Sequence, residues 1–406
     1  MMAQGDVRGH ENEDRHAPAH PADGLLTPLD ADEQPLLSVV MPTLNEENSV
    51  GECLDQAKHA IHELGVSAEL VVSDSSTDRT PEIARERGAI VYEPDRPGYG
   101  YAYRYAFERA RGEYVVMGDA DSTYDFERIP ALLELVTEGG ADIAIGSRLD
   151  GEIRDGAMPA LHRYVGNPAL TWFLNLFYDA DVSDAHSGFR VLRRSALEEM
   201  DLSADGMELA SEMIMEASVR GLEIAELPIT YHPREGEATL HSFRDGWRHV
   251  RFMLLNAPGY LFSGPGLVIG LLGLALMTVA YADVSLFGAT PGVHSMVAGS
   301  LLTILGYQVG SFGVFATIAG DPVRNPEDEV TRWFRERFRL EHGGTVGVVL
   351  FVLGVSYATL LFWSWVQSGY VQLPSLLDDI VAMTAIVLGA QTVFGSFFLS
   401  AIGDDV

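Results

Sequence analysis

Four long apolar segments in the last third of the chain restrict its fold more than any other feature. None of them contains Asp, Glu, Lys or Arg; they are Leu261–Ala282, Met296–Ile318, Thr345–Val366 and Ile380–Ile402. Each has at least the roughly 20 residues that an α-helix needs to cross a bilayer. One such segment could be a helix buried in a soluble core, but four in succession predict a four-helix transmembrane domain over residues 259–406.

The loops between these segments predict how the protein is oriented. The loop 320–344 holds five arginines, whereas the loops 283–293 and 367–379 hold neither Lys nor Arg. By the positive-inside rule, the Arg-rich loop, both termini and everything before the first span lie in the cytoplasm. Residues 241–258 carry aromatic and aliphatic side chains at helical spacing between arginines, which predicts an amphipathic helix at the membrane interface.

The charge balance excludes some partners and suggests an environment. With 58 acidic and 27 basic residues the net charge is −31, whereas nucleic-acid binding needs clustered Lys and Arg. Lys58 is the only lysine, and so acidic a composition suggests a proteome adapted to high salt, which screens self-repulsion. A merely acidic cytosolic protein is the alternative. The single cysteine, Cys53, excludes an intrachain disulfide. Residues 1–34 are acidic and rich in His and Pro, which predicts a disordered tail without a signal peptide.

Residues 35–240 show the pattern of an α/β domain, because short apolar runs alternate with amphipathic helical patterns. The predicted strands are Leu36–Met41, Ala68–Ser73, Ala89–Tyr92, Tyr114–Met117 and Ala141–Ile145, and the predicted helices are Glu47–Leu64, Thr80–Arg87, Tyr99–Arg109 and Ile129–Val136. This alternation implies right-handed crossovers and a mostly parallel sheet, with ligands at the carboxyl ends of its strands.

Two carboxylates follow the central predicted strand. After Tyr114–Met117 the chain continues Gly118-Asp119-Ala120-Asp121. In extended chain Asp119 and Asp121 point the same way, so both can face one ligand. Paired anionic oxygens suit Mg²⁺ or Mn²⁺ carrying a diphosphate. A solvated turn is the alternative for an isolated Asp-x-Asp motif.

Several ordered motifs resemble those of family 2 glycosyltransferases. They are Ser38–Glu46, Val71–Asp78, Gly118–Asp121 and Ser183–Arg190. Within that family, further segments are similar to membrane-anchored dolichyl- and polyprenyl-phosphate sugar synthases: Thr123–Phe126, Gly146–Arg148, Gly156–Pro159, Leu161–Tyr164 and Arg244–His249. The resemblance implies a Rossmann-like nucleotide-sugar fold of the glycosyltransferase A type.

The resemblance also implies site residues for the donor. Metal ligands would be Asp119 and Asp121, and nucleotide contacts would come from Pro42, Asn45, Glu46, Asp74, Gly98 and Asp119. For Asp74 a turn cap is an equal alternative, and a plain turn also explains Pro42, Asn45 and the glycines. The chain departs from the family at Ser73, which replaces an acid, and at Thr123, where some relatives place a metal-ligating Gln.

For the acceptor phosphate, the resemblance implies that arginines bind it. A lipid monophosphate is mostly dianionic at neutral pH, so it needs cations that hold it rather than a strong base. Arginine suits this task because its guanidinium holds phosphate with a fixed fork of donors. We select Arg148, Arg163 and Arg234, with a surface ion pair as the alternative for each. Asp184 would position the acceptor, act as a base, or bind Arg190 structurally. The segment Gly236–Leu240 lacks a family Ser-Lys pair.

These features predict a metal-dependent, inverting hexosyltransferase with Asp121, Arg148 and Asp184 as catalytic residues. It would move one hexose from UDP-glucose or GDP-mannose to dolichyl phosphate at the cytoplasmic face, supplying lipid-linked sugar for glycosylation. Two other functions stay open at this point: a processive polysaccharide synthase, and a non-catalytic membrane scaffold with a dead transferase domain. Whether the protein forms homo-oligomers is also open.

Overall fold

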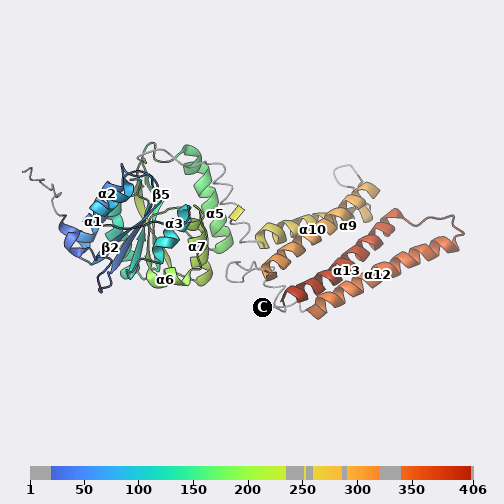
Figure 1. Ribbon diagram of the computed structural model, residues 1–406. Helices are drawn as coiled ribbons and strands as arrows, with labels where there is room; N and C mark the ends of the chain where they lie inside the picture. Colours follow the sequence, from blue (N-terminus) through green and yellow to red (C-terminus); the bar gives the residue numbers. More distant parts are fainter. Residues whose placement is uncertain (1–19, 235–250, 253–258, 286–289, 320–339, 404–406) are drawn as a thin grey trace, which may run out of the picture. The chain divides into compact units, whose positions relative to one another are not determined.

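A computed structural model describes residues 20–234, 251–252, 259–285, 290–319 and 340–403 (Figure 1). Contacts divide the chain into two compact units. The first contains Met1–Thr171, Val182–Met213 and Leu222–Leu240, and the second contains Trp172–Asp181, Ile214–Gly221 and His241–Val406. The boundaries at residues 35–240, 241–258 and 259–406 stay predictions.

The first unit is built on one seven-stranded sheet with the order β3-β2-β1-β4-β6-β5-β7. The strands are β1 (Leu37–Thr43), β2 (Ala68–Asp74), β3 (Ile90–Tyr92), β4 (Tyr114–Met117), β5 (Ile143–Ile153), β6 (Arg190–Arg193) and β7 (Ile224–Tyr231). Only β6 runs antiparallel to its neighbours, and the other pairings are parallel. The mostly parallel α/β sheet predicted from the alternation is therefore confirmed.

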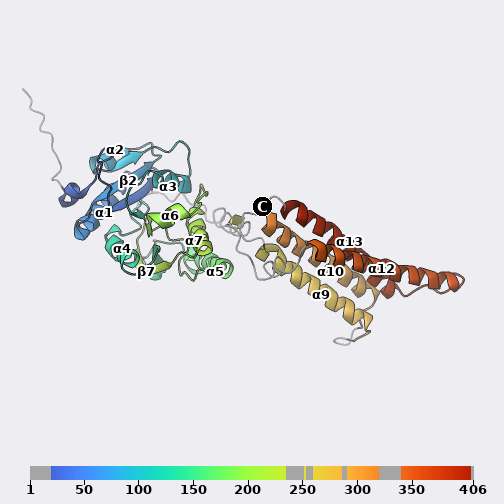
Figure 2. The same cartoon turned by 90° about the horizontal axis from the view of Figure 1, so that it is seen from below.

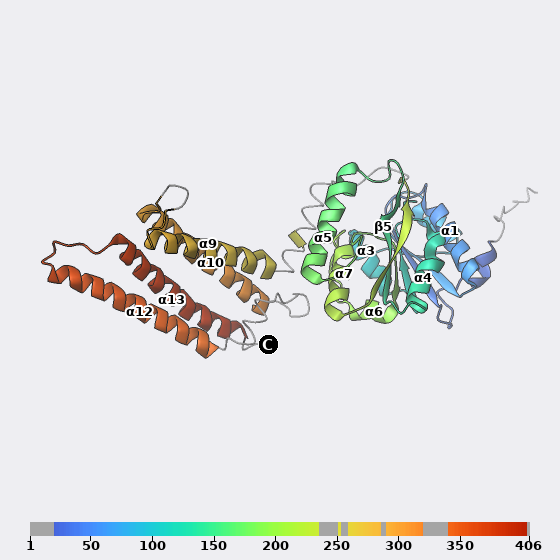
Figure 3. The same ribbon diagram turned by 180° about the vertical axis from the view of Figure 1, so that it is seen from behind.

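Helices cover both faces of this sheet. They are α1 (Val50–Leu64), α2 (Thr80–Glu86), α3 (Tyr99–Phe107), α4 (Ile129–Thr137), α5 (Asn167–Tyr178), α6 (Arg194–Glu199) and α7 (Leu209–Arg220). The division between the two units falls within α5 and within α7. Figure 3 shows α1 and α4 on one face of the sheet and α3 on the other. Alternate residues of a strand point to opposite faces, and Leu37, Val39 and Met41 of β1 accordingly share a core with Leu54 and Ile61 of α1.

The residues before the sheet correct one prediction. Disorder over residues 1–34 is wrong for residues 20–34, while residues 1–19 lie outside the described chain. The helical turn η1 (Pro21–Leu25) buries Ala22 completely, and Asp23 forms a 2.8 Å ion pair with Lys58. Arg111 donates to the carbonyl oxygens of four residues of this segment: Thr27, Pro28, Leu29 and Ala31. Composition alone missed these contacts, because a few apolar side chains and one distant arginine make them.

Among its described residues, the second unit holds four helices that are long and apolar enough to cross a membrane. They are α9 (Gly264–Tyr281), α10 (Val293–Ala319), α12 (Leu340–Gln367) and α13 (Leu376–Gly403). Figure 2 shows α9 beside α10 and α12 beside α13. Glycine allows the first pair to approach closely: a Cβ at Gly266 would lie 2.4 Å from the backbone of Gly310, and one at Gly273 would lie 2.4 Å from that of Thr303. The predicted interfacial helix lies outside the described residues except for Arg251 and Phe252, and most of the Arg-rich loop also lies outside them.

Candidate active site

The predicted donor residues lie where β1, β2 and β4 end. Because these strands are parallel neighbours, their carboxyl ends meet at one edge of the sheet. Thr43 and Asp74 are partners in the register of β1 and β2, and the Thr43 hydroxyl donates a 2.7 Å hydrogen bond to Asp74 Oδ1. Pro42 is the partner of Ser73 one position earlier. The buried Asp74 carboxylate is thereby held at the edge where a ligand would bind.

The loop after β1 is fixed by its own polar contacts. Asn45 adopts a left-handed backbone conformation with a φ of 60°. Its side-chain Oδ1 accepts a 2.9 Å hydrogen bond from the Thr77 backbone, and its own N–H donates to Ser76 Oγ at 2.7 Å. Asn45 therefore joins the loop after β1 to the loop after β2. This gives Asn45 a structural role, and contact with a nucleotide stays a prediction.

Gly98 also has a structural reason to be glycine. Its φ of 147° is rarely adopted by residues with a side chain. In addition, a Cβ there would lie 2.5 Å from the carbonyl oxygen of Asp205. The start of α3 therefore packs directly on the backbone near Asp205, and the predicted approach of Gly98 to a nucleotide stays untested.

Asp119 lies just beyond β4 and is oriented by two tyrosines of α3. The hydroxyls of Tyr99 and Tyr103 donate hydrogen bonds to Asp119 Oδ1, at 2.8 Å and 3.2 Å. Asp119 Oδ2 accepts from neither tyrosine. Burial and the nearby Asp121 raise the pKa of Asp119 to about 7, although the two hydroxyls oppose the shift. Sequence reasoning missed these tyrosines. Their spacing of four residues on one predicted helix was the available signal.

Asp121 is held in a similar way. Its Oδ1 accepts from the backbone N–H and the hydroxyl of Thr123, at 3.1 Å and 2.5 Å. Its Oδ2 lies 3.6 Å from Arg234 Nη1. Thr123, which stands where some relatives have a metal-ligating Gln, thus orients Asp121 through its hydroxyl.

Arg234 contacts two acidic side chains at the carboxyl edge of the sheet. Besides Asp121 it forms an ion pair with Glu46 Oε1. Burial raises the pKa of Glu46, and the positive charge of Arg234 opposes this shift. The predicted acceptor arginine and the predicted nucleotide residue Glu46 are therefore partners in this structure.

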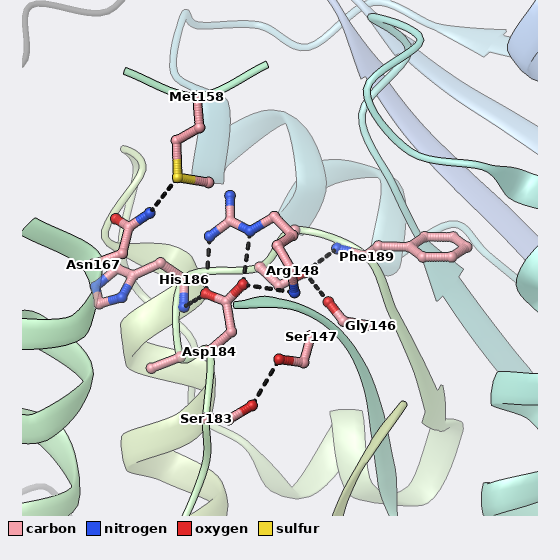
Figure 4. Close-up of polar contacts among 12 residues, drawn as sticks. Gly146, Ser147, Arg148, Met158, Asn167, Ser183, Asp184, His186 and Phe189 are labelled. Atoms are coloured by element: carbon pink, nitrogen blue, oxygen red, sulfur yellow. Dashed lines mark hydrogen bonds and ion pairs between the residues drawn. The ribbon is translucent and has the colours of Figure 1, made fainter. Parts of the chain in front are cut away.

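Arg148 and Asp184 form a buried ion pair (Figure 4). Asp184 Oδ2 accepts from the Arg148 backbone N–H at 3.0 Å and from Nε at 2.7 Å, while Oδ1 accepts from Nη2 at 2.9 Å. Despite its burial, Asp184 has a lowered pKa, because Arg148 supplies both positive charge and hydrogen bonds. Of the three predicted roles for Asp184, the geometry favours positioning, since a base needs a pKa nearer the working pH.

The alternative bond from Asp184 to Arg190 is not the one that the structure forms. Arg190 instead donates to the carbonyl oxygens of Ser187 and Ala185, both at 2.9 Å. Burial lowers the pKa of its guanidinium to about 10. Sequence reasoning missed Glu226, which also helps to hold Asp184 in place. The Glu226 carboxylate accepts hydrogen bonds from the backbone N–H groups of Ser183 and Asp184, at 2.7 Å and 3.1 Å.

Aromatic rings link the carboxylates to the Arg148 pair. A Cβ at Gly188 would lie 3.1 Å from Asp119 Oδ2 and 3.3 Å from the Tyr124 hydroxyl, so glycine keeps this space open. The rings of Tyr124 and Tyr231 are 5.3 Å apart, and the Arg148 guanidinium lies 5.2 Å from the centre of the Tyr231 ring. The two predicted halves of the site are thus connected through one layer of packed side chains.

Arg163 lies apart from this pair on the helical turn η3 (His162–Gly166). It donates a 3.4 Å hydrogen bond to the carbonyl oxygen of Ile153, and its guanidinium lies 5.3 Å from the ring centre of Tyr164. Arg163 is half-buried. The acceptor role of Arg163 stays a prediction.

The donor set at Asp119 and Asp121 fits Mg²⁺ or Mn²⁺. Each carboxylate accepts its hydroxyl donors through Oδ1. Oδ2 of Asp119 accepts from neither tyrosine, and Oδ2 of Asp121 lies 3.6 Å from Arg234 Nη1. Two carboxylate oxygens are few for a complete protein cage, and the described residues contain no cluster of three or more His, Cys, Asp or Glu that could hold a metal. This pattern matches Mg²⁺ sites, which use one or two carboxylates and complete their coordination with substrate phosphates and water.

Comparisons with known proteins agree with this geometry. Residues 38–201 match glycosyl transferase family 2, and residues 319–403 match the family 2 C-terminal transmembrane region. The low-salt glycan biosynthesis hexosyltransferase Agl6 of Haloferax volcanii is 56% identical over 401 residues, covering 99% of this chain and 96% of that protein. A dolichyl-phosphate hexose transferase of the same organism is 38% identical, covering 52% of this chain and 89% of that protein.

A solved structure that matches part of this chain is glucosyl-3-phosphoglycerate synthase from Mycobacterium tuberculosis in complex with Mn²⁺, UDP and glucosyl-3-phosphoglycerate. It is 26% identical, with a TM-score of 0.44, and the match covers 54% of this chain and 79% of that chain. The extent of the Agl6 match and the two family regions settle the assignment. The chain belongs to glycosyltransferase family 2 and is a multi-pass membrane glycosyltransferase.

Proposed function

We propose that this enzyme transfers a single hexose from a nucleotide-sugar to dolichyl (polyprenyl) phosphate at the cytoplasmic face of the membrane. The names of two relatives, a hexosyltransferase and a dolichyl-phosphate hexose transferase, support the sugar class and the acceptor class. The observation that carries the proposal is the pair Asp119 and Asp121 at the end of β4, oriented by hydroxyls and connected through Tyr124 and Tyr231 to Arg148.

On the donor side, Asp119 and Asp121 would hold Mg²⁺ or Mn²⁺ through Oδ2. A divalent ion there offsets the negative charge that develops on a departing nucleoside diphosphate. Tyr99, Tyr103 and Thr123 keep the carboxylates in place before substrate binds, so little reorganisation is needed during transfer. Asp74 would accept hydrogen bonds from the nucleobase or ribose of UDP-glucose or GDP-mannose.

On the acceptor side, the nucleophile is an oxygen of the lipid phosphate, which is mostly dianionic at neutral pH. The residues therefore have to hold and aim the phosphate, and no side chain has to remove a proton. Arg148 is aimed by Asp184, and Arg163 and Arg234 would add further donors. Attack in line with the departing diphosphate inverts the anomeric carbon.

The test uses the full-length protein in membranes with dolichyl phosphate, Mn²⁺ and radiolabelled UDP-glucose or GDP-mannose. We expect label in a lipid monophosphate sugar, and we expect Asp121→Asn to abolish it. Asp125→Asn is the matched control, because Asp125 lies in the same loop but only caps η2 (Phe126–Arg128), and asparagine caps equally well. Wild-type transfer by Asp121→Asn would refute the metal role.

The same experiment separates the two other functions. A polysaccharide synthase would give a ladder of products longer than one hexose. A scaffold with a dead domain would transfer nothing from either donor and would also bind neither nucleotide. Thermal stabilisation by UDP or GDP with Mn²⁺ checks binding independently, because a ligand stabilises only the fold that binds it.

A further inference from the structure

The hydroxyl of Tyr124 is a buried hydrogen-bond donor whose proton has no acceptor among the described residues. Tyr124 lies in the loop between β4 and η2 and is 3% exposed. Its hydroxyl oxygen accepts a 2.8 Å hydrogen bond from the backbone N–H of Gly188, and no residue within the described ranges accepts from this hydroxyl in return. Buried donors without a partner are rare and destabilise a fold. A ligand that supplies the acceptor would explain this one.

The Tyr124 hydroxyl lies beside the oxygen that we assign to the metal. A Cβ at Gly188 would lie 3.3 Å from this hydroxyl and 3.1 Å from Asp119 Oδ2, so the two oxygens border one small space. The Tyr124 ring packs on those of Phe189 and Tyr231, whose centres are 5.5 Å and 5.3 Å away. This packing leaves the hydroxyl little freedom to turn elsewhere. A ligand held next to Asp119 Oδ2 would therefore lie beside the Tyr124 hydroxyl.

The Arg148 guanidinium acts on the same hydroxyl. Burial raises the pKa of Tyr124, and the positive charge of Arg148 opposes this shift. The hydroxyl therefore stays protonated at neutral pH and is able to donate. Asp184 occupies two of the three guanidinium nitrogens of Arg148, so a phosphate at Arg148 needs donors from other side chains. The Tyr124 hydroxyl is such a donor, between the carboxylates and the arginine.

We propose that the Tyr124 hydroxyl donates a hydrogen bond to an oxygen of the acceptor phosphate, which makes Tyr124 a further catalytic residue. The inference rests on the proposed function, because it assigns a residue to the same acceptor. A neutral donor suits this position, since the phosphate has to approach the negative charges of Asp119 and Asp121. The alternative is that Tyr124 only holds the backbone of Gly188. That role explains the 2.8 Å bond but gives the proton no acceptor.

The test measures sugar transfer by the purified full-length protein in lipid nanodiscs. Mn²⁺ and UDP-glucose or GDP-mannose are kept saturating while dolichyl phosphate is varied. Loss of a hydrogen bond to a charged group weakens binding roughly 10–100-fold, so Tyr124→Phe should lower kcat/KM for dolichyl phosphate about 10-fold or more. The Kd of UDP or GDP with Mn²⁺ should stay within about twofold, because the lost contact is to the acceptor. A parallel loss of nucleotide affinity would assign Tyr124 a structural role and overturn the proposal.

Thr171→Val is the matched control, because it removes a hydroxyl that has the same structural task. Thr171 Oγ1 accepts a 3.3 Å hydrogen bond from the backbone N–H of Ala185, in the same Ser183–Arg190 motif that contains Gly188. We expect this variant to keep kcat/KM for dolichyl phosphate within about twofold. If loss of a backbone partner were the cause of the defect, both variants would show it. Equal losses in Thr171→Val and Tyr124→Phe would therefore also overturn the proposal.

A spectroscopic measurement keeps the hydroxyl in place and does not depend on how the phenylalanine variant folds. Tyr124 is replaced by a fluorotyrosine, and its fluorine NMR resonance is followed with Mn²⁺ and UDP or GDP bound. Dolichyl phosphate should shift the resonance, whereas dolichol, which lacks the phosphate, should not. An equal response to both lipids would refute the contact. Absence of transfer to dolichyl phosphate by the wild type would refute the proposed function itself, whereas transfer with unchanged kcat/KM in Tyr124→Phe would refute this inference alone.

Discussion

Replacing Asp184 by asparagine tests how the Arg148 guanidinium is held. The substitution keeps the size of the side chain but removes the charge that faces three donors of Arg148. The side chains of Arg148 and Asp184 are 9% and 0% exposed, so water cannot replace the lost partner. Leaving one charge of a buried pair uncompensated costs about 3–5 kcal/mol. At about 2–4 °C per kcal/mol for a domain of this size, the midpoint should fall by roughly 6–20 °C.

The assay is thermal unfolding of the purified full-length protein in detergent, followed by intrinsic fluorescence. Glu152→Gln is the control, because it breaks the 3.0 Å pair with Arg154, whose members are 58% and 53% exposed. An exposed pair contributes about 0–1 kcal/mol, so its midpoint should move by less than about 4 °C. Equal shifts for Asp184→Asn and Glu152→Gln would refute the argument from burial.

A double substitution then separates stability from chemistry. Arg148→Met combined with Asp184→Leu removes both charges, and exchange of a buried pair for apolar side chains is often neutral or stabilising. We expect the midpoint to return toward the wild-type value while transfer stays abolished. Restored stability together with restored transfer would show that Arg148 has only a structural role.

Four further predictions concern the carboxylates and the first residues of the fold. Tyr99→Phe with Tyr103→Phe should weaken Mn²⁺ binding about 10–100-fold in calorimetry, because both hydroxyls orient Asp119. The pKa of Asp119 is about 7, so Mn²⁺ affinity should rise between about pH 6 and 8 as the carboxylate ionises. Because this pKa is raised in the folded state, the metal-free protein should also lose stability as pH rises from about 4 to 7. Arg111→Ala should lower stability by about 1–3 kcal/mol in thermal unfolding, since the 1% exposed Glu69 loses a charged donor.

Much of the fold follows from local patterns, and the exceptions have a common cause. The predicted strands and helices before residue 140 match β1–β4 and α1–α4 to within a few residues. Within the α/β domain, the helices and strands after β5 were not predicted, among them β7 (Ile224–Tyr231) and the antiparallel β6 (Arg190–Arg193) between β4 and β5. Hydrophobic periodicity reports which face of a strand is buried but not the direction in which the strand runs. The Arg190 guanidinium donates to two carbonyl oxygens of the turn before β6, and no periodic pattern reveals these contacts.

The site shows the same division between local and distant information. Asp119 and Asp121 were predictable, because their positions follow from one strand and one spacing. The partners of the arginines were not, since Asp184 lies 36 residues from Arg148 and Glu46 lies 188 residues from Arg234. Resemblance identified these side chains as belonging to the site, but only the packed structure shows that Arg148 and Arg234 already have carboxylate partners.

This pairing assigns different tasks to the arginines in the proposed reaction. Arg148 is buried and held by Asp184 through two donors of its guanidinium, so any phosphate contact falls to its remaining terminal nitrogen. Arg234 is 28% exposed and shares Asp121 with the proposed metal site, so a divalent ion there competes with it for the carboxylate. Occupation of the donor site therefore weakens the hold of Asp121 on Arg234. Arg234 also pairs with Glu46, so we expect a bound metal ion to release only the guanidinium nitrogen that faces Asp121 and to leave it available to the proposed acceptor phosphate.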